Sequence, residues 1–142
     1  MSGGMSAAQV GLALKMAGLS PFSLDIDMFR IVRDGENYFV YTDRLPEIYI
    51  EKVVQLECYD FKNDNWNTFL AMNLYNSRRT PVVAYRGCTD DTVSFRICIK
   101  PESFDDFQEN LNSYFEQIGY AVNAFGQACE VVGREDGKDN QQ

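Results

Sequence analysis

The sequence contains no histidine among its 142 residues, so the side chain that most often serves as a general base is missing. A Ser or Cys nucleophile would need a Lys or carboxylate base instead, and nothing in the spacing places one beside it. None of the ten glycines follows the spacing of a phosphate-binding or dinucleotide-binding loop. We therefore expect no enzymatic activity and assign no catalytic residue.

Metal-binding patterns are scarce as well. Four cysteines lie far apart in the chain and form no C-x-x-C pair: Cys58, Cys88, Cys98 and Cys129. Each lies among apolar residues, so we interpret all four as small buried hydrophobic side chains that need no disulfide. Asp25 and Asp27 could share a metal ion, but a solvated face of a strand is the simpler interpretation. We predict no metal and no cofactor.

Positive charge is also in short supply. The 13 Lys and Arg residues are outnumbered by 21 Asp and Glu residues, for a net charge of -8. Such a chain repels phosphate backbones and anionic lipid surfaces. The apolar stretch over residues 10–19 is too short to span a bilayer and is interrupted by Lys15. We expect a cytoplasmic protein that binds neither nucleic acid nor membranes.

Apolar residues, by contrast, are plentiful. Hydrophobic residues make up 45% of the chain and aromatic residues 13%, which is enough to build a core in a single domain. We expect a flexible leader over residues 1–5 and a single α+β domain over residues 6–132. The polar residues 133–142 are expected to form a disordered tail.

The first half of the chain predicts a helix followed by an antiparallel meander. The expected elements are a helix over residues 6–18, capped by Ser6 and ended by Gly18, and strands over residues 24–32, 38–42 and 48–58. Apolar alternation changes phase within residues 24–32, so we expect a bulge there or burial of both faces. Asp34-Gly35 and residues 43–46 are typical of the turns between these strands.

The second half predicts a helix, a hairpin and a long final helix. The cap-forming residues 63–65 precede a helix over residues 66–76, in which Trp66, Leu70 and Leu74 are expected to form the buried stripe. Two strands follow over residues 81–88 and 92–99; we expect Tyr85 opposite Phe95 and Val83 opposite Ile97 on the buried side, and Arg86, Ser94 and Arg96 on the other. The final helix carries an apolar seam at helical spacing: Phe104, Phe107, Leu111, Phe115, Ile118, Val122 and Phe125. This seam of about 38 Å either covers the sheet, which we favour, or packs on a partner helix.

Two asparagines near the end of the middle helix have an expected structural role. We expect Asn76 to be the left-handed residue that ends the helix, and Asn73 to bond neighbouring backbone. Replacing either one by Ala should then lower the melting temperature.

Charge is distributed unevenly along the second half. Basic residues gather before the final helix, whereas residues 102–130 hold six acidic residues and no basic one. The two regions could pair within the fold, pair across a dimer, or bind a protein partner. The candidates for partner binding are Arg78, Arg79, Arg86 and Arg96.

The motif Asn73-Leu74-Tyr75-Asn76, followed by PVVAYRG, TVSFRICI and the final helix, resembles the YbjN-like family of bacterial proteins. Proteins of this family are described as sensory-transduction regulators, and their fold is similar to that of class I type III secretion chaperones. The resemblance implies an α-β-β-β-α-β-β-α order with a five-stranded antiparallel sheet and no enzymatic activity. It also implies an acidic homodimer that binds extended segments of client proteins.

The sequence thus favours a non-catalytic, cytoplasmic protein-binding or regulatory domain that forms a homodimer. One alternative is a small-molecule sensor whose pocket is lined by Tyr38, Tyr41, Tyr85 and Trp66. An enzyme with an unrecognised carboxylate or cysteine site is a further alternative.

Overall fold

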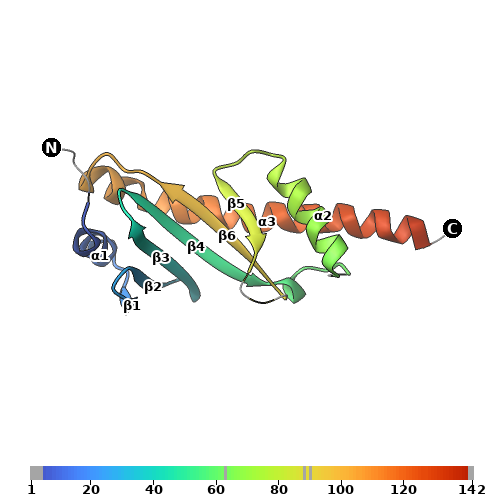
Figure 1. Ribbon diagram of the computed structural model, residues 1–142, viewed down its shortest axis with the longest axis horizontal. Coiled ribbons are helices and arrows are strands. Elements are labelled where there is room, and N and C mark those ends of the chain that lie inside the picture. Colours follow the sequence, from blue (N-terminus) through green and yellow to red (C-terminus); the bar gives the residue numbers. More distant parts are fainter. Residues whose placement is uncertain (1–4, 63, 88, 90, 141–142) are drawn as a thin grey trace.

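The computed structural model describes residues 5–62, 64–87, 89 and 91–140, with side chains described through residue 135. These residues form an α+β fold with one six-stranded antiparallel sheet and three α-helices (Figure 1). The elements in chain order are α1 (Ala7–Met16), β1 (Phe22–Asp25), β2 (Met28–Arg33), β3 (Glu36–Arg44), β4 (Glu47–Gln55), a 3-10 turn η1 (Leu56–Cys58), α2 (Asn65–Asn76), β5 (Val82–Arg86), β6 (Thr92–Ile99) and α3 (Phe104–Asn140).

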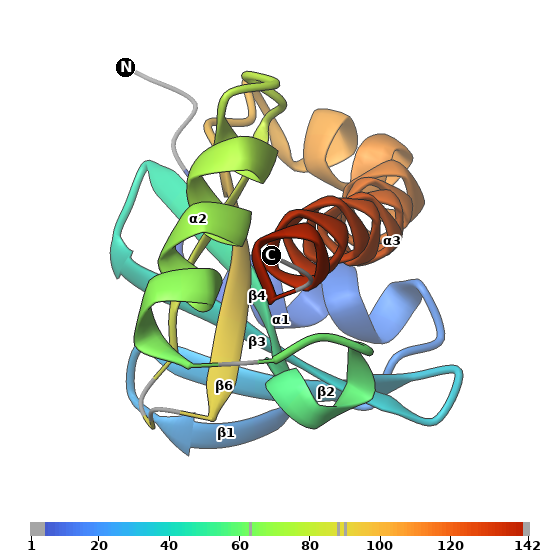
Figure 2. The same ribbon diagram turned by 90° about the vertical axis from the view of Figure 1, so that its right-hand side faces the viewer.

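The sheet has the order β1-β2-β3-β4-β6-β5 and curves around α3, as Figure 2 shows in a view along that helix. We call the face that meets α1 and α3 the inner face. Helix α2 contacts both α3 and the edge strand β5. The opposite, outer face is left open by the described helices, and Val83 on it is 51% exposed. This arrangement separates one covered face of the sheet from one uncovered face.

Several local predictions are confirmed. Ser6 caps α1 through a capping box with Gln9, and Gly18 follows the helix with a φ of 84°. Asp34 and Gly35 both have positive φ and connect β2 to β3, as the hairpin signal predicts. These caps and turns depend on chemistry within a few residues, and for that reason the sequence predicts them well.

Of the expected leader, residues 1–4 lie outside the described residues, and Met5 is buried.

The predicted five-stranded sheet is wrong by one strand. The segment over residues 24–32 is not one bulged strand, because the chain turns at Ile26 and Asp27 and splits it into β1 and β2. The Asp25 carboxylate accepts a hydrogen bond from the Ile26 amide at 2.7 Å and so stabilises the turn. The phase change in the apolar alternation therefore marks a hairpin, and all four residues of β1 are exposed.

The third predicted strand is too long at its end. Strand β4 stops at Gln55, and residues 56–58 form the 3-10 turn η1. Leu56 is buried as expected, but its amide donates to the Asp91 carbonyl at 2.8 Å in the loop before β6. Cys58 is exposed, so its apolar neighbours in sequence do not bury it.

The hairpin of β5 and β6 has a register one residue away from the predicted one. Val82 lies opposite Ile97 and Ala84 opposite Phe95, so Val82 and Ala84 are buried whereas Val83 is exposed. A shift of one residue exchanges the two faces of a strand. It places Arg86 on the inner face and leaves Arg96 on the outer face, so the two arginines do not share a surface as predicted.

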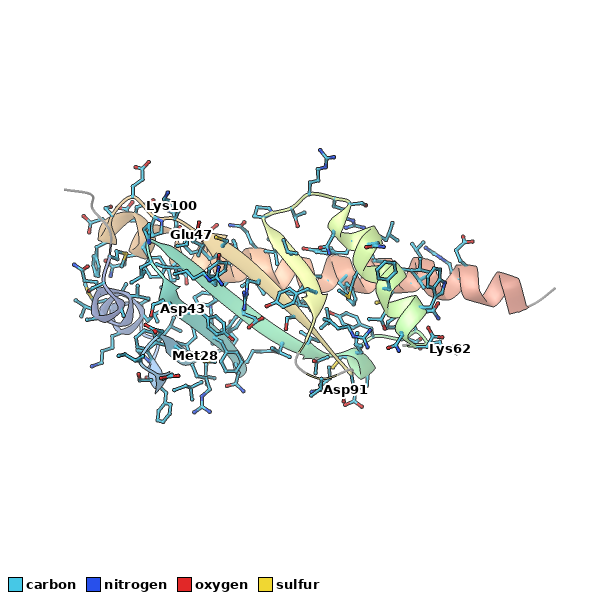
Figure 3. The ribbon with its side chains drawn as sticks, viewed as in Figure 1. Met28, Asp43, Glu47, Lys62, Asp91 and Lys100 are labelled. Atoms are coloured by element: carbon cyan, nitrogen blue, oxygen red, sulfur yellow. The ribbon has the colours of Figure 1, made fainter. Side chains whose placement is uncertain are left out.

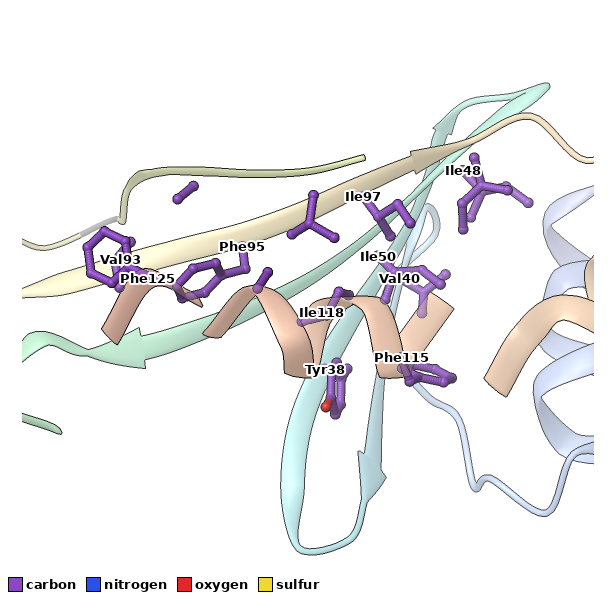
Figure 4. Close-up of a cluster of buried hydrophobic side chains, with 14 of the residues drawn as sticks. Tyr38, Val40, Ile48, Ile50, Val93, Phe95, Ile97, Phe115, Ile118 and Phe125 are labelled. Carbon is purple, nitrogen blue, oxygen red and sulfur yellow. The ribbon is translucent and has the colours of Figure 1, made fainter. Parts of the chain in front are cut away.

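Helix α3 covers the inner face of the sheet with its apolar seam, as predicted. Phe115, Ile118 and Phe125 are buried against residues of β3, β4 and β6 (Figure 4). Phe125 lies 5.6 Å from Phe95, ring centroid to centroid, in an edge-on arrangement. The helical backbone continues to Asn140, past residue 132 where the sequence analysis ends the domain.

Helix α2 forms where predicted but is rotated about its axis. Asp64 caps it by accepting from the Asn67 amide at 2.8 Å. Its buried side is formed by Asn67, Thr68, Ala71 and Tyr75, while Trp66 and Leu74 are exposed. The predicted buried stripe is therefore wrong. Tyr75 packs edge-on against Phe95 and Phe125, and this aromatic contact sets the rotation.

Candidate functional site

The four arginines predicted to bind a partner do not form one site. Arg78 and Arg79 lie at the end of α2, and both are exposed. The Arg78 Nη2 lies 3.5 Å from Oε1 of Gln127 on α3. Arg86 donates to Oδ1 of Asn65 at 2.7 Å on the inner side of the sheet. The structure thus brings Arg78 and Arg79 together and separates them from the other two.

Arg96 belongs to a polar cluster on the outer face of the sheet. Glu51, only 5% exposed, accepts hydrogen bonds from the hydroxyls of Tyr41 and Tyr85 and lies 3.5 Å from Nη2 of Arg96. Burial raises the pKa of Tyr85 well above its ordinary value of 10.0, and the hydrogen bond to Glu51 raises it further. The cluster therefore keeps a buried carboxylate fully paired on an otherwise open surface.

Three tyrosine rings surround the Arg96 guanidinium. Its central carbon lies 5.2 Å from the ring centre of Tyr41, 5.1 Å from that of Tyr49 and 5.3 Å from that of Tyr85. The Tyr49 hydroxyl donates to Glu47 at 3.0 Å, and Figure 3 labels Glu47 near the start of β4. The space between these three rings is thus occupied by a cationic side chain of the same chain.

The aromatic pocket proposed for a small-molecule sensor does not assemble from its four residues. Tyr41 and Tyr85 share the outer-face cluster, where Arg96 fills the space between their rings. Tyr38 points to the inner face and contacts Phe115 edge-on. Trp66 lies on α2, beside its stacked neighbour Phe69. The four side chains therefore face three different parts of the molecule.

A groove lies between α2, the loop before β5 and α3, and we call it the α2–α3 groove. It contains two hollows, of about 360 and 210 Å³. The first is lined by Trp66, Asn67, Leu70, Leu74, Val131, Val132 and Glu135, and the second by Tyr75, Thr80, Pro81, Val82, Gln117, Tyr120, Ala121 and Ala124. Together they follow α3 from residue 117 to residue 135, about 27 Å at 1.5 Å per residue.

Large apolar side chains border this groove without being buried. Trp66 is 66% exposed and Tyr120 is 72% exposed, and Leu74 and Val131 also reach solvent. The α3 residues that line the two hollows carry no charge except Glu135. Arg78, which bonds to Gln127 between the hollows, brings positive charge to the middle of the groove. Exposed apolar side chains beside two hollows, with a positive charge between the hollows, are typical of a protein-binding site.

The sequence pattern does not predict this groove, because Trp66 and Leu74 fit the expected buried stripe of the helix but are exposed. One signal could have found it. Trp66 and Tyr75 are nine residues apart, which places them on opposite sides of an α-helix. If Tyr75 is taken as the inward anchor, Trp66 must point outward. The end of the helix was also misassigned, because the left-handed residue is Arg79 with a φ of 56° and not Asn76.

Within the part of the chain that the structure describes, no group of three or more His, Cys, Asp or Glu residues is placed to hold a metal ion. Cys58, Cys98 and Cys129 carry free thiols, and Cys88 lies outside the described residues. Of the predicted buried cysteines, Cys129 is buried, whereas the prediction is wrong for Cys58 and Cys98, which are exposed. Burial raises the pKa of the Cys129 thiol to about 12, which keeps it protonated at neutral pH. The described helices include none long and apolar enough to cross a membrane.

No known relative was found. In comparisons with known proteins, no family model, no curated protein and no solved structure matches the chain. The resemblance to the YbjN-like family and to the secretion chaperones therefore stays a prediction.

Proposed function

We propose that this protein is a non-catalytic binding domain that holds a segment of a protein partner in the α2–α3 groove. The supporting observation is a pair of hollows, one of mixed lining and one of mainly apolar lining, that are flanked by exposed Trp66 and Tyr120. Tryptophan and tyrosine are the residues that most often dominate binding energy at protein interfaces. Trp66 and Tyr120 contribute little to the buried core of this chain. Contact with a partner would bury them and so explains their exposure beside the two hollows better.

The hollows define the chemistry of the partner segment. Their centres are near residues 121 and 132 of α3, about 16 Å apart along the helix. Two apolar side chains about five residues apart in an extended segment, or about eleven apart in a helix, would reach both hollows. Arg78 and Arg79 favour an acidic side chain between these anchors. The proposed partner segment is therefore apolar at both ends and acidic in the middle.

The wider setting of this proposal follows the sequence resemblance. A cytoplasmic regulator or chaperone-like protein would use such a groove to hold a segment of its client, and would act as a homodimer. The acidic net charge of -8 suits a protein that keeps apolar client segments soluble. The polar pairing of Glu51 on the outer face supports a binding scaffold rather than a reaction centre.

Selection from a library of random peptides tests the proposal. The wild-type protein should enrich peptides with two apolar anchors and an acidic residue between them. Val131→Asp, at the first hollow, should weaken these peptides at least about tenfold, because it places a charge where an apolar side chain docks. Val53→Asp is a matched control, since Val53 on the outer face is as exposed as Val131, at 37%.

Two results would overturn the proposal. Selection that yields no binder at all would remove the groove as a binding site. Peptides that bind Val131→Asp and wild type equally well, but lose affinity with Val53→Asp, would move the site to the outer face of the sheet.

A further inference from the structure

The two edge strands of the sheet, β5 and β1, differ in how far side chains bond their outward-facing backbone groups. At the β5 edge, the Asn76 side chain donates to the Ala84 carbonyl at 2.7 Å and accepts from the Ala84 amide at 3.0 Å. The Tyr75 hydroxyl donates to the Val82 carbonyl at 2.8 Å on the same edge. These side chains occupy the backbone groups that another strand would use, so the β5 edge is closed to further pairing.

The β1 edge is less protected. The Ser23 hydroxyl donates to the Asp25 carbonyl at 3.1 Å, and the pairing with β2 shifts register between Ser23 and Asp25. Strand β1 is at the end of the sheet order, and among the described strands it pairs with β2 alone. All four of its residues are exposed, and Phe22, Leu24 and the adjoining Ile26 are large apolar side chains. Ile26 is 82% exposed. An exposed edge strand with apolar side chains can act as a template for pairing with another strand.

More exposed apolar side chains lie at the same end of the molecule. Helix α1 and strands β1 and β2 are found together at the end opposite to α2 (Figure 1). Leu12 and Met16 on α1 and Val32 on β2 are exposed there. This group is separate from the α2–α3 groove, so the groove does not account for it.

Opposite charges lie at the two ends of β1, so two antiparallel copies of the strand would place opposite charges beside each other. The Arg30 guanidinium lies over the Phe22 ring, 5.2 Å from its centre, at the first residue of β1. Asp25 is the last residue of the strand. Phe22 pairs with Arg30 and Asp25 with Met28, both outer-face residues of β2. One end of β1 is therefore basic and the other acidic, on one face of the sheet.

We propose that β1 pairs antiparallel with β1 of a second copy of this chain, about a two-fold axis between Ser23 and Leu24. In this register Asp25 of each copy lies opposite Phe22 of the other, within reach of the Arg30 that covers that ring. The two six-stranded sheets become one continuous sheet, with Leu24 and Ile26 covered at the junction. This inference rests on the homodimer in the proposed function, and it assigns the β1 edge as the surface through which the two copies bind.

A different occupant, such as an extended strand of another protein, would not need this charge symmetry. The observation that favours a second copy is that one β1–β2 hairpin supplies both members of the proposed ion pair, Asp25 from β1 and Arg30 from β2. With only four residues in the strand, the dimer should be weak and depend on protein concentration. Such a dimer exchanges readily, which suits a regulatory protein.

Sedimentation velocity over a range of concentrations tests the interface. Wild type should show a concentration-dependent dimer. Asp25→Arg and Arg30→Asp should each weaken it about tenfold, because each variant replaces two attractive pairs by two repulsive ones. The double variant, with both charges exchanged, should restore it. Glu109→Arg, an exposed charge reversal on α3, is the matched control and should leave the dimer intact.

Asp25 also stabilises the turn at Ile26, so Asp25→Arg alone could disturb β1 itself. Leu24→Lys avoids this turn and should also abolish the dimer, with an unchanged melting temperature. A wild-type dimer that survives all three single variants would overturn the β1 interface and leave the homodimer standing. A wild-type protein that stays monomeric at every concentration would overturn both, without affecting the α2–α3 groove.

Discussion

At the scale of single residues, Asn76 connects the helix α2 to the sheet. Its side-chain amide bonds both backbone groups of Ala84, as a residue of a neighbouring strand would do. Asn73, one turn earlier in the helix, is exposed, and its carbonyl accepts from the Ser77 amide at the helix end. The two asparagines of the N-x-aromatic-N motif therefore have different roles, although the sequence alone assigned both to the stabilisation of the helix end.

Asn76→Ala should lower the free energy of unfolding by about 2 kcal/mol, because it leaves the amide and carbonyl of Ala84 without their partner on a half-buried edge. Asn73→Ala is the control. The sequence alone predicts a loss of stability here too, but because the Asn73 side chain is exposed, the change should be less than about 0.5 kcal/mol. Urea unfolding followed by circular dichroism measures both. Equal losses for the two variants would contradict the role assigned to Asn76.

The residue scale also shows what the sequence could predict. Ser6, Asp64, Asp34 and Gly35 act within a few residues of themselves, and each forms the cap or turn that its type favours. The left-handed residue after α2 is Arg79, a residue with no preference for that conformation, so composition could not identify it. It is held there by the path of the chain from α2 into β5.

At the scale of elements, α3 organises the molecule by burying polar groups as well as apolar ones. Tyr59 donates to the Val122 carbonyl of α3 at 3.1 Å and packs edge-on against Phe125. Cys129 is buried on the same helix. Burial raises the pKa of Tyr59 well above its ordinary value of 10.0 and that of Cys129 to about 12. Both groups are therefore neutral in the folded protein far into the alkaline range.

Stability should decrease as pH rises above about 9. In the unfolded chain Cys129 and Tyr59 lose their protons near their ordinary values of 9.0 and 10.0, whereas the folded protein keeps them longer. Because the unfolded state then binds fewer protons, the free energy of unfolding falls with pH, and it is unaffected by these groups below pH 9. Urea midpoints measured across this range should show the fall.

Cys129→Ala separates the two contributions. The variant should lose part of its stability at neutral pH, but its dependence on pH should begin later, near the ordinary pKa of tyrosine. A wild-type protein with constant stability throughout the alkaline range would show that these groups are not buried as described.

Rotation and register were the parts of the elements that the sequence could not fix. Helix α2 could present either Trp66 or Tyr75 inward, because both are large and aromatic and lie on opposite sides. Strand β5 has apolar residues on both faces, so its sequence fits two registers, one residue apart, almost equally well. In both cases contacts with distant residues, Phe95 and Phe125 among them, decide the outcome.

At the scale of the whole molecule, the two groups of exposed apolar residues lie at opposite ends. The β1 end has an open strand edge, and the α2 end has the α2–α3 groove; Figure 3 labels Met28 at the first and Lys62 at the second. This separation allows one molecule to bind its own copy at one end and a partner segment at the other. The sequence predicted the α+β class and the long covering helix, but not which surfaces stay open.

One physical cause explains why the sequence does not predict which apolar surfaces stay open. A pattern of apolar residues shows which side chains seek burial, but not whether the fold or a partner buries them. Trp66, Leu74 and Val83 fit core patterns in the sequence, and the fold leaves all three exposed. The candidate site was therefore hidden among residues assigned to the core, and only its arginines, Arg78 and Arg79, could be named in advance.

The emission of Trp66 tests the central claim most directly, because it is the single tryptophan of the chain and borders the groove. A peptide selected on the wild-type protein should shift its emission to shorter wavelengths and protect it from iodide quenching, since the bound segment removes water from the indole. An unchanged spectrum and unchanged quenching at saturating peptide would contradict the account, because binding would then occur away from the α2–α3 groove.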